Sequence, residues 1–229
     1  IFIFFNIFFN VKTYREYSTV IKRRIFIVAL IFALLPFFPA SSFADLSSAV
    51  KKYKHAKISK TQLLKLRKYD HLIRYFSGFS FFRPRYKVSP DFIRALILAE
   101  SDCNTFAVSQ KDALGLGQII HSTGREAARD IYNIRMEFRY INENKLRNLQ
   151  KEDLFDPAIN ILLTCYLISK YNYRFNGRLD LVVSAWNAGE NVDSLKIGLP
   201  APYSETHNLI GKVNAYYLHL LKLRKKSRS

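Results

Sequence analysis

The sequence predicts a single, mainly α-helical globular domain that carries one very small β element. Apolar residues recur at helical spacing along most of the chain after Asp45, and several segments open with the Ser-Pro or Asp-Pro pairs typical of helix N-termini. No internal repeat and no βαβ alternation is present, which argues against repeat and doubly wound folds. Hydrophobic residues make up 49% of the 229 residues, enough to build one core.

The first predicted helical segment covers 45–88. Within it, Ser59 or Thr61 opens a basic amphipathic helix that extends to residue 76, and a connection rich in Phe and Arg follows over 77–88. The apolar residues of this helix are Leu63, Leu64, Leu66, Leu72, Ile73 and Phe76, mostly at helical spacing.

The next helix is short, strongly apolar and ends on a glutamate. Ser89 is predicted as its N-cap and Pro90 as its first residue, and the helix then extends to Glu100. Beyond it, Gly115 and Gly117 in "ALGLGQII" predict a tight turn or a short strand pair.

The second half of the chain is predicted to be helical with one polar interruption. A helix fits 122–133, and a connector full of Asn, Arg and Lys fills 139–153. Asp156-Pro157 then opens a long apolar helix that stops at Asn176-Gly177.

Two helices complete the predicted domain, which we place at 89–221. "RLDLVVSAWNAG" forms a helix that ends on Gly189, and Ser204 is expected to cap a long last helix. Residues 222–229 form a basic tail that we expect to be frayed.

The N-terminal segment 1–44 has the pattern of an export signal behind a short extension. Basic residues 22–24 precede an apolar stretch over 25–35, and small residues up to Ala44 suit a cleavage site. We expect translation to start just before the basic residues, cleavage after Ala44, a periplasmic location and no stable membrane span in the mature protein. An uncleaved anchor is the alternative, because the apolar segment almost reaches spanning length.

The net charge of the chain indicates which kinds of partner it can attract. Lys and Arg total 36 against 18 Asp and Glu, a net charge of +18 that predicts attraction to polyanions. No nucleic-acid-binding motif is apparent, so nucleic acid is not expected as a partner. No metal site or cofactor is expected either, because the histidines are scattered at His55, His71, His121, His207 and His219.

Glu100 is the candidate for chemistry. Leu96 and Ile97 precede it by four and three residues, so its carboxyl projects from an apolar helix face. Apolar surroundings favour the neutral acid, which suits a general acid near neutral pH. For an isolated glutamate, a structural role at a helix end would be the better interpretation.

Four segments that occur in a characteristic order favour a catalytic role for Glu100 instead. "ALILAESDCNTFAVSQKDALGLGQI", "DPAINILLTCYLISKY", "RLDLVVSAWNAG" and "PYSETHNLIGKVNAYY" are similar to segments of the catalytic domain of soluble lytic transglycosylases. The resemblance covers roughly Tyr69 to Leu221 and implies a goose-lysozyme-like fold. It also implies that the partner is the glycan strand of peptidoglycan. We expect the protein to be a monomer.

The resemblance assigns site residues position by position. It makes Glu100 the catalytic acid, and the substrate-binding residues that it implies are Ser101, Ser109, Gly115, Leu116, Gln118, Trp186, Asn187 and Glu205. Thr206 completes the family's "ET" pair at the start of the last helix.

Three departures from the family pattern are present, and the last of them involves a pair of residues. Gly117 replaces a methionine, which we expect to open a subsite of the cleft. Trp186 replaces a tyrosine, and its indole N–H can donate a hydrogen bond but never accept one. Thr164 and Cys165 replace a pair of small residues, which is a change in packing.

The reaction implied by the resemblance needs one carboxylic acid. Glu100 protonates the glycosidic oxygen, the N-acetyl group of N-acetylmuramic acid (MurNAc) assists at C1, and the product is a 1,6-anhydro sugar. One alternative is a water-using muramidase with Asp102 or Asp112 as a second carboxylate. Another is a catalytically weak peptidoglycan-binding factor of a secretion or conjugation system.

Cys103 and Cys165 leave two states open. In an exported protein a pair of cysteines is compatible with one disulfide, and two buried free thiols are equally compatible with the sequence.

Overall fold

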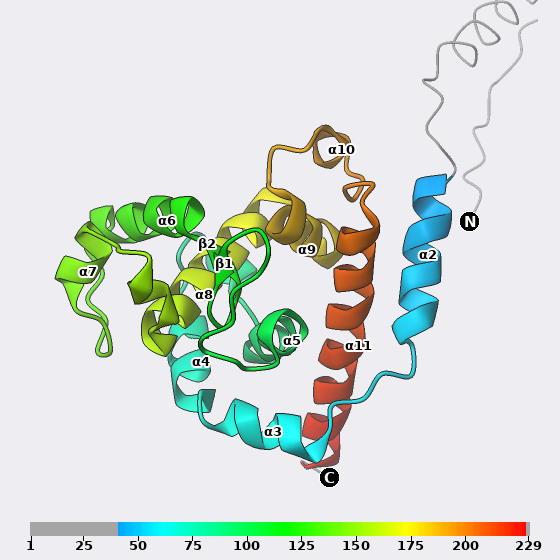
Figure 1. Ribbon diagram of the computed structural model, residues 1–229, viewed down its shortest axis with the longest axis horizontal. Helices are drawn as coiled ribbons and strands as arrows, with labels where there is room; N and C mark the ends of the chain where they lie inside the picture. Colours follow the sequence, from blue (N-terminus) through cyan, green and yellow to red (C-terminus); the bar gives the residue numbers. More distant parts are fainter. Residues whose placement is uncertain (1–40, 228–229) are drawn as a thin grey trace, which may run out of the picture. The chain divides into compact units, whose positions relative to one another are not determined.

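The computed structural model describes residues 41–227 of the chain, and side chains from residue 46 (Figure 1). Most of the prediction for segment 1–44 therefore lies outside the described residues. The elements are α2 (Ser41–Tyr53), α3 (Lys60–Arg67), α4 (Asp70–Ser77), the 3₁₀ helix η1 (Pro84–Tyr86), α5 (Pro90–Ser101), β1 (Ala113–Leu114), β2 (Ile119–Ile120), α6 (His121–Asn133), α7 (Glu143–Arg147), the 3₁₀ helix η2 (Glu152–Phe155), α8 (Pro157–Arg174), α9 (Leu179–Ala188), α10 (Asp193–Lys196) and α11 (Ser204–Lys226).

The predicted fold class is confirmed: the described chain is mainly helical, with a sheet of only two short strands. Two helices form its centre. Residues 91–99 of α5 and 158–169 of α8 are all buried, which explains why both segments are predominantly apolar. Helix α5 packs along α11, and α8 packs against α4, α6 and α9 (Figure 1). Among the described residues, no helix is long and apolar enough to cross a membrane.

The predicted start residues mark the starts of α5, α8 and α11 to within one residue, but only Asp156 among them forms a side-chain cap. Asp156 caps α8, with its side chain accepting a 2.8 Å hydrogen bond from the backbone N–H of Ala158. Ser89 occupies the N-cap position of α5, but its side chain makes no capping bond. Ser204 is the first residue of α11, and Tyr203 occupies the N-cap position instead.

Two other expectations need correction. The helix predicted up to residue 76 is two helices, α3 and α4, because the chain turns at Lys68 and Tyr69. The ring of Tyr69 is buried at this corner, and its hydroxyl lies 2.7 Å from that of Thr105. The polar connector over 139–153 contains the short helix α7, which Asn142 caps.

The β element is an antiparallel pair in which Ala113 faces Ile120 and Leu114 faces Ile119. Its turn requires glycine at position 115, where φ is +73° and a Cβ would lie 2.3 Å from the carbonyl oxygen of Leu154. The buried side chain of Asn160 on α8 holds this turn. It accepts from the N–H of Gly117 at 2.8 Å and donates to the carbonyl oxygen of Leu114 at 3.0 Å.

Candidate active site

A groove opens where the end of α5, the β turn, the start of α6, α9 and the start of α11 meet. Its polar lining contains Glu100, Ser109, Lys111, Gln118, Thr123, Tyr171, Trp186, Asn187 and Glu205. Apolar residues between them are Ala113, Ile119, Ile120 and Leu167. Six of the nine site residues predicted from the sequence therefore lie in one groove, although they come from three separate segments of the sequence.

Glu100 lies at the end of α5 with its carboxyl largely removed from water. Burial raises the pKa of this carboxyl from 4.5 to about 7. Two groups oppose that shift: the indole of Trp186 donates a 2.8 Å hydrogen bond to Oε1, and the positive charge of Lys212 is nearby. The effect of burial is larger than these two opposing effects. Near neutral pH, a large fraction of the molecules therefore have Glu100 protonated.

The hydrogen bond from Trp186 also selects which oxygen carries that proton. The indole N–H is a donor only, so Oε1 must accept. The acidic proton is then placed on Oε2. Lys212 is held next to this carboxyl by a hydrogen bond, because its Nζ donates at 2.8 Å to the carbonyl oxygen of Ala99 in the last turn of α5.

Ser109 and Gln118 are held by the backbone around the β turn. The Ser109 hydroxyl oxygen accepts from the N–H groups of Lys111 at 3.2 Å and Ala113 at 3.0 Å, so its own proton can point elsewhere. Gln118 has a φ of +55°, and its side-chain amide donates to the carbonyl oxygens of Ala107 and Gly115 at 3.1 and 2.9 Å.

Asn187 and Thr206 connect α9 to α11. The Thr206 hydroxyl donates a 2.6 Å hydrogen bond to Oδ1 of Asn187. Asn187 also bonds the carboxylate of Glu205, which helps to keep the pKa of that group low. This bonding fixes Asn187 beside Glu205 on the groove wall.

Three predicted site residues do not line the groove. The Ser101 hydroxyl lies 2.7 Å from the carbonyl oxygen of Leu116, and this bond ties the end of α5 to the β turn. Leu116 itself is fully buried, and Gly115 is buried in the turn. These residues support the walls of the groove in this structure.

The expectation for Gly117 is wrong. This residue is buried and faces α8, so the missing methionine does not open the groove. A Cβ at position 117 would lie 2.3 Å from Oγ1 of Thr164. The glycine at 117 and the threonine at 164, noted separately in the sequence, thus fill one space together.

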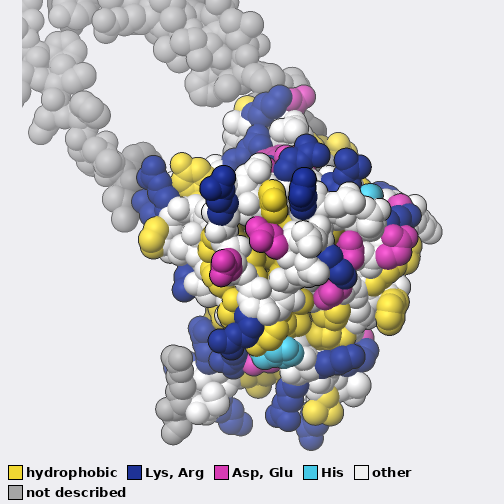
Figure 2. All heavy atoms as spheres, turned by 90° about the vertical axis from the view of Figure 1, so that its left-hand side faces the viewer, with side chains coloured by type: hydrophobic (Ala, Val, Ile, Leu, Met, Phe, Trp, Pro, Cys, Tyr) yellow, Lys and Arg dark blue, Asp and Glu magenta, His cyan; other side chains and the backbone are white. Residues whose placement is uncertain are grey.

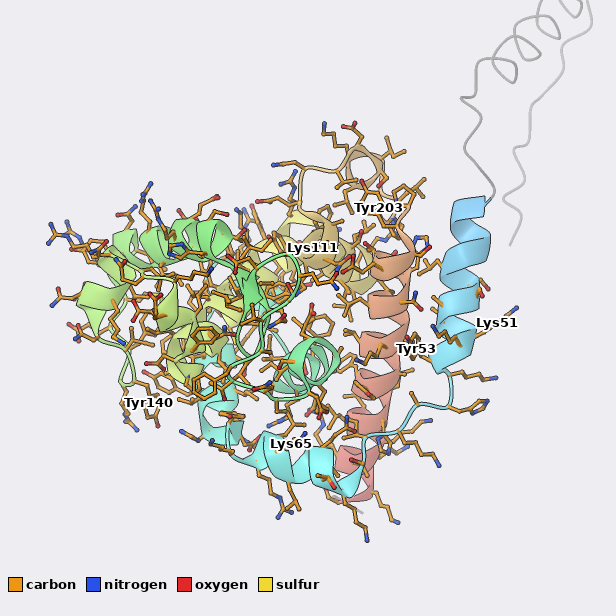
Figure 3. All side chains as sticks on the ribbon, viewed as in Figure 1. Lys51, Tyr53, Lys65, Lys111, Tyr140 and Tyr203 are labelled. Carbon is orange, nitrogen blue, oxygen red and sulfur yellow. The ribbon has the colours of Figure 1, made fainter. Side chains whose placement is uncertain are left out.

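Lys111 is a groove residue that the sequence prediction missed. Its Nζ forms a 2.6 Å ion pair with Glu205, and both side chains are exposed. Figure 3 shows Lys111 on the loop before β1, on the side of the domain where α11 begins next to Tyr203. The pair therefore joins two walls of the groove across 94 residues of sequence.

The two alternative second carboxylates lie outside the groove. Asp102 bonds Lys65 and Gln62 on α3, at 2.5 and 2.7 Å, and Asp112 pairs with Lys151 at 2.6 Å. Within the described residues, Glu205 is the one other carboxylate in the groove lining. No group of three His, Cys, Asp or Glu side chains suited to a metal ion is found there or elsewhere in the described part of the chain.

Cys103 and Cys165 are both buried free thiols, so of the two states left open by the sequence the structure has the free thiols and not the disulfide. Burial raises the pKa of the Cys103 thiol to about 12, with the charge of Asp102 adding to the effect, and burial also raises that of Cys165.

Comparison with known families identifies the domain. The family model of the transglycosylase SLT domain matches residues 80–201, just over half of the chain. This chain belongs to the transglycosylase SLT domain family. The match contains the end of α5, the β turn and α9, and thus most of the groove of this SLT domain.

Individual relatives agree with the assignment. The chain is 33% identical over 112 residues to the membrane-bound lytic murein transglycosylase C of Shigella sonnei, covering 46% of this chain and 28% of that protein. The crystal structure of the 70 kDa soluble lytic transglycosylase from Escherichia coli superposes with a TM-score of 0.52 and 21% identity, over 68% of this chain and 24% of the other. It confirms the lysozyme-like fold of the SLT domain.

A second structure, the lytic transglycosylase Slt from Pseudomonas aeruginosa, gives a TM-score of 0.47 at 23% identity, over 61% of this chain and 23% of the other. The matched parts of the chain thus span about a quarter of the length of these relatives.

Proposed function

We propose that this SLT domain is a peptidoglycan lytic transglycosylase that cleaves the β-1,4 bond between MurNAc and N-acetylglucosamine (GlcNAc). The observation that carries the proposal is Glu100, a groove carboxyl whose pKa of about 7 lets it both give and take a proton. Family membership and the relative named as a lytic murein transglycosylase support the substrate.

In the proposed reaction Glu100 acts twice. Its protonated Oε2 gives a proton to the glycosidic oxygen while the C1–O bond breaks and the N-acetyl oxygen of MurNAc bonds to C1. The Glu100 carboxylate then takes the proton of the C6 hydroxyl, and O6 displaces the acetamido oxygen from C1. The product is 1,6-anhydro-MurNAc, no water is consumed, and Glu100 ends protonated as it began.

The remaining carboxylate of the groove suits a different role. The exposed Glu205 pairs with Lys111, which holds the pKa of its carboxyl below the usual range. It therefore stays ionised when Glu100 is protonated. We assign Glu205 to substrate positioning, together with Ser109, Gln118 and Asn187, and Trp186 to orienting Glu100.

The proposal extends to the organisation of the chain. We assign 1–44 to an extension and export signal, 45–88 to an N-terminal helical segment, 89–221 to the catalytic domain and 222–229 to a basic tail. Export to the periplasm would bring the domain to its substrate. Sequencing the N-terminus of the mature protein tests this: a first residue at or close to Asp45 supports it, and a retained segment 25–35 contradicts it.

Digestion of purified sacculi tests the reaction. We expect the parent to release muropeptides that end in anhydro-MurNAc, which lack the mass of one water. Glu100→Gln should fold and bind sacculi but lose at least about 10²–10⁴-fold in turnover. The control is Glu137→Gln, which removes an exposed carboxylate outside the groove and should turn over like the parent.

Each other outcome has a meaning. Hydrated reducing ends would indicate the muramidase, and binding by the parent without turnover would indicate a wall-binding factor. Near-parent turnover by Glu100→Gln would refute the assignment of this carboxyl.

A further inference from the structure

A second pocket lies between α6 and α7. Figure 2 shows this side of the domain, where many Lys and Arg side chains are interspersed with Asp and Glu. The walls of the pocket carry three arginines, Arg125 and Arg129 on α6 and Arg147 at the end of α7. The pocket is lined mostly by polar groups, and none of its lining residues is acidic. A 3.0 Å hydrogen bond from Nε2 of His121 to the carbonyl oxygen of Leu149 joins the two walls.

The three arginine side chains of this pocket are all exposed. In the part of the chain whose side chains are described, no carboxylate forms an ion pair with Arg125, Arg129 or Arg147. Other arginines do pair, as Arg94 does with Asp91 at 2.5 Å and Arg178 with Asp180 at 2.6 Å. Like charges gathered in a concave site focus a positive potential there, which attracts an anion from outside.

The spacing of the charges indicates the kind of anion. Arg125 and Arg129 are one helical turn apart, so about 6 Å of helix axis separates them, and Arg147 adds a third charge from the opposite wall. Carboxylates on neighbouring or alternate residues of an extended peptide are about 3.5–7 Å apart. Several separate carboxylates on one extended peptide match a row of charges with this spacing.

The position of the pocket relates it to the groove. Ile120 and Thr123, at the start of α6, line the groove, whereas His121 and Arg125 line the basic pocket. The two sites thus lie on different sides of the same helix, whose width with side chains is about 10–12 Å. An extended peptide of four or five residues reaches about 13–18 Å, enough to pass around it.

From this arrangement we propose that the pocket binds the carboxylates of a stem peptide attached to the glycan strand in the groove. The inference rests on the proposed function for its substrate. It adds that the domain recognises the acidic peptide as well as the sugars. The pocket would thereby favour strands whose stems keep their free carboxylates.

Binding to sacculi before and after chemical amidation of the carboxyl groups tests the proposal. Proteins carry Glu100→Gln so that the substrate is not consumed, and the bound fraction is measured by sedimentation at low salt. We expect the protein that also carries Arg125→Gln/Arg129→Gln to bind native sacculi about five- to tenfold more weakly than the protein that carries Glu100→Gln alone. On amidated sacculi, the two proteins should bind equally.

Two further variants complete the comparison. Arg147→Gln removes the charge of the opposite wall and should weaken binding to native sacculi in the same direction. Arg135→Gln/Arg139→Gln is the matched control, because it removes two exposed arginines that lie outside the pocket. It should change the binding to native sacculi less than twofold.

The outcomes separate the pocket from the catalytic proposal. Equal losses in the pocket and control doubles would reduce the effect to general charge and overturn the inference. So would a loss confined to phosphatidylglycerol vesicles, which would make the pocket a phosphate site. Turnover of native sacculi by the protein with Glu100 intact is measured alongside, and its absence would refute the proposed function without deciding the binding result.

Discussion

Replacing Glu100 by Gln should change the pH dependence of folding stability, as well as activity. Unfolded, this carboxyl titrates near 4.5, whereas burial in the folded chain raises its pKa to about 7. The folded chain therefore retains a proton that the unfolded chain loses as the pH rises above 4.5, and stability falls until the pH passes the folded pKa. Above that pH the ionised carboxylate costs on the order of 3 kcal/mol.

Glu100→Gln removes this cost because an amide does not ionise, while its oxygen can still accept from Trp186. Most of the effect falls between pH 5 and pH 8. The stability of the variant relative to the parent should accordingly rise by roughly 2 kcal/mol between these two pH values. The sign is the opposite of that expected for a carboxylate stabilised by an ion pair.

Urea denaturation at pH 5 and pH 8 measures the effect directly. Trp186 is the only tryptophan and lies 2.8 Å from the Glu100 carboxyl, so its fluorescence reports on this site. Glu137→Gln is the control and should show the same stability difference from the parent at both pH values. A difference between Glu100→Gln and the parent that does not change with pH would show that this carboxyl titrates normally in the folded chain.

Three further predictions concern the surroundings of the groove. Trp186→Ala should lower turnover on sacculi at least about tenfold and Trp186→Tyr less, because Ala removes both the ring and the donor; parent-like turnover of the Ala variant would contradict this. Gly117→Ala should lower the free energy of unfolding, measured by urea denaturation, by about 1–3 kcal/mol. In a protein that already carries Thr164→Ala, which lacks the atom 2.3 Å from the new Cβ, the same change should cost much less, and additive effects would rule out the shared space. Cys103 and Cys165 should resist iodoacetamide until the chain is unfolded, because both are buried free thiols, and labelling of the native protein would disprove it.

Local sequence signals predicted the helices well where the physical cause is local. The cap of Asp156 on α8 depends on atoms two residues apart, and the proline that follows tolerates a helix start. The break between α3 and α4 escaped prediction because it depends on burying Tyr69 against residues far along the chain. Periodicity alone continues through such a corner.

The composition of the groove could be predicted only in part. Motif order was enough to bring Glu100, Trp186 and Asn187 into one site. The sequence carried no signal for Lys111, because its partner Glu205 is 94 residues away and the pair forms only when two walls meet. Gly117 and Thr164 appeared as separate departures because their shared space exists only once the β turn packs on α8.

By itself, the sequence determined the helical class, the apolar helix that ends on Glu100 and the family motifs, since each depends on residue type and short spacing. Only the tertiary structure decided the state of that glutamate. Its raised pKa is a balance between burial by several elements and the opposing effects of Trp186 and Lys212, which come from α9 and α11. Desolvation depends on everything packed around a group, and no local stretch of sequence contains that sum.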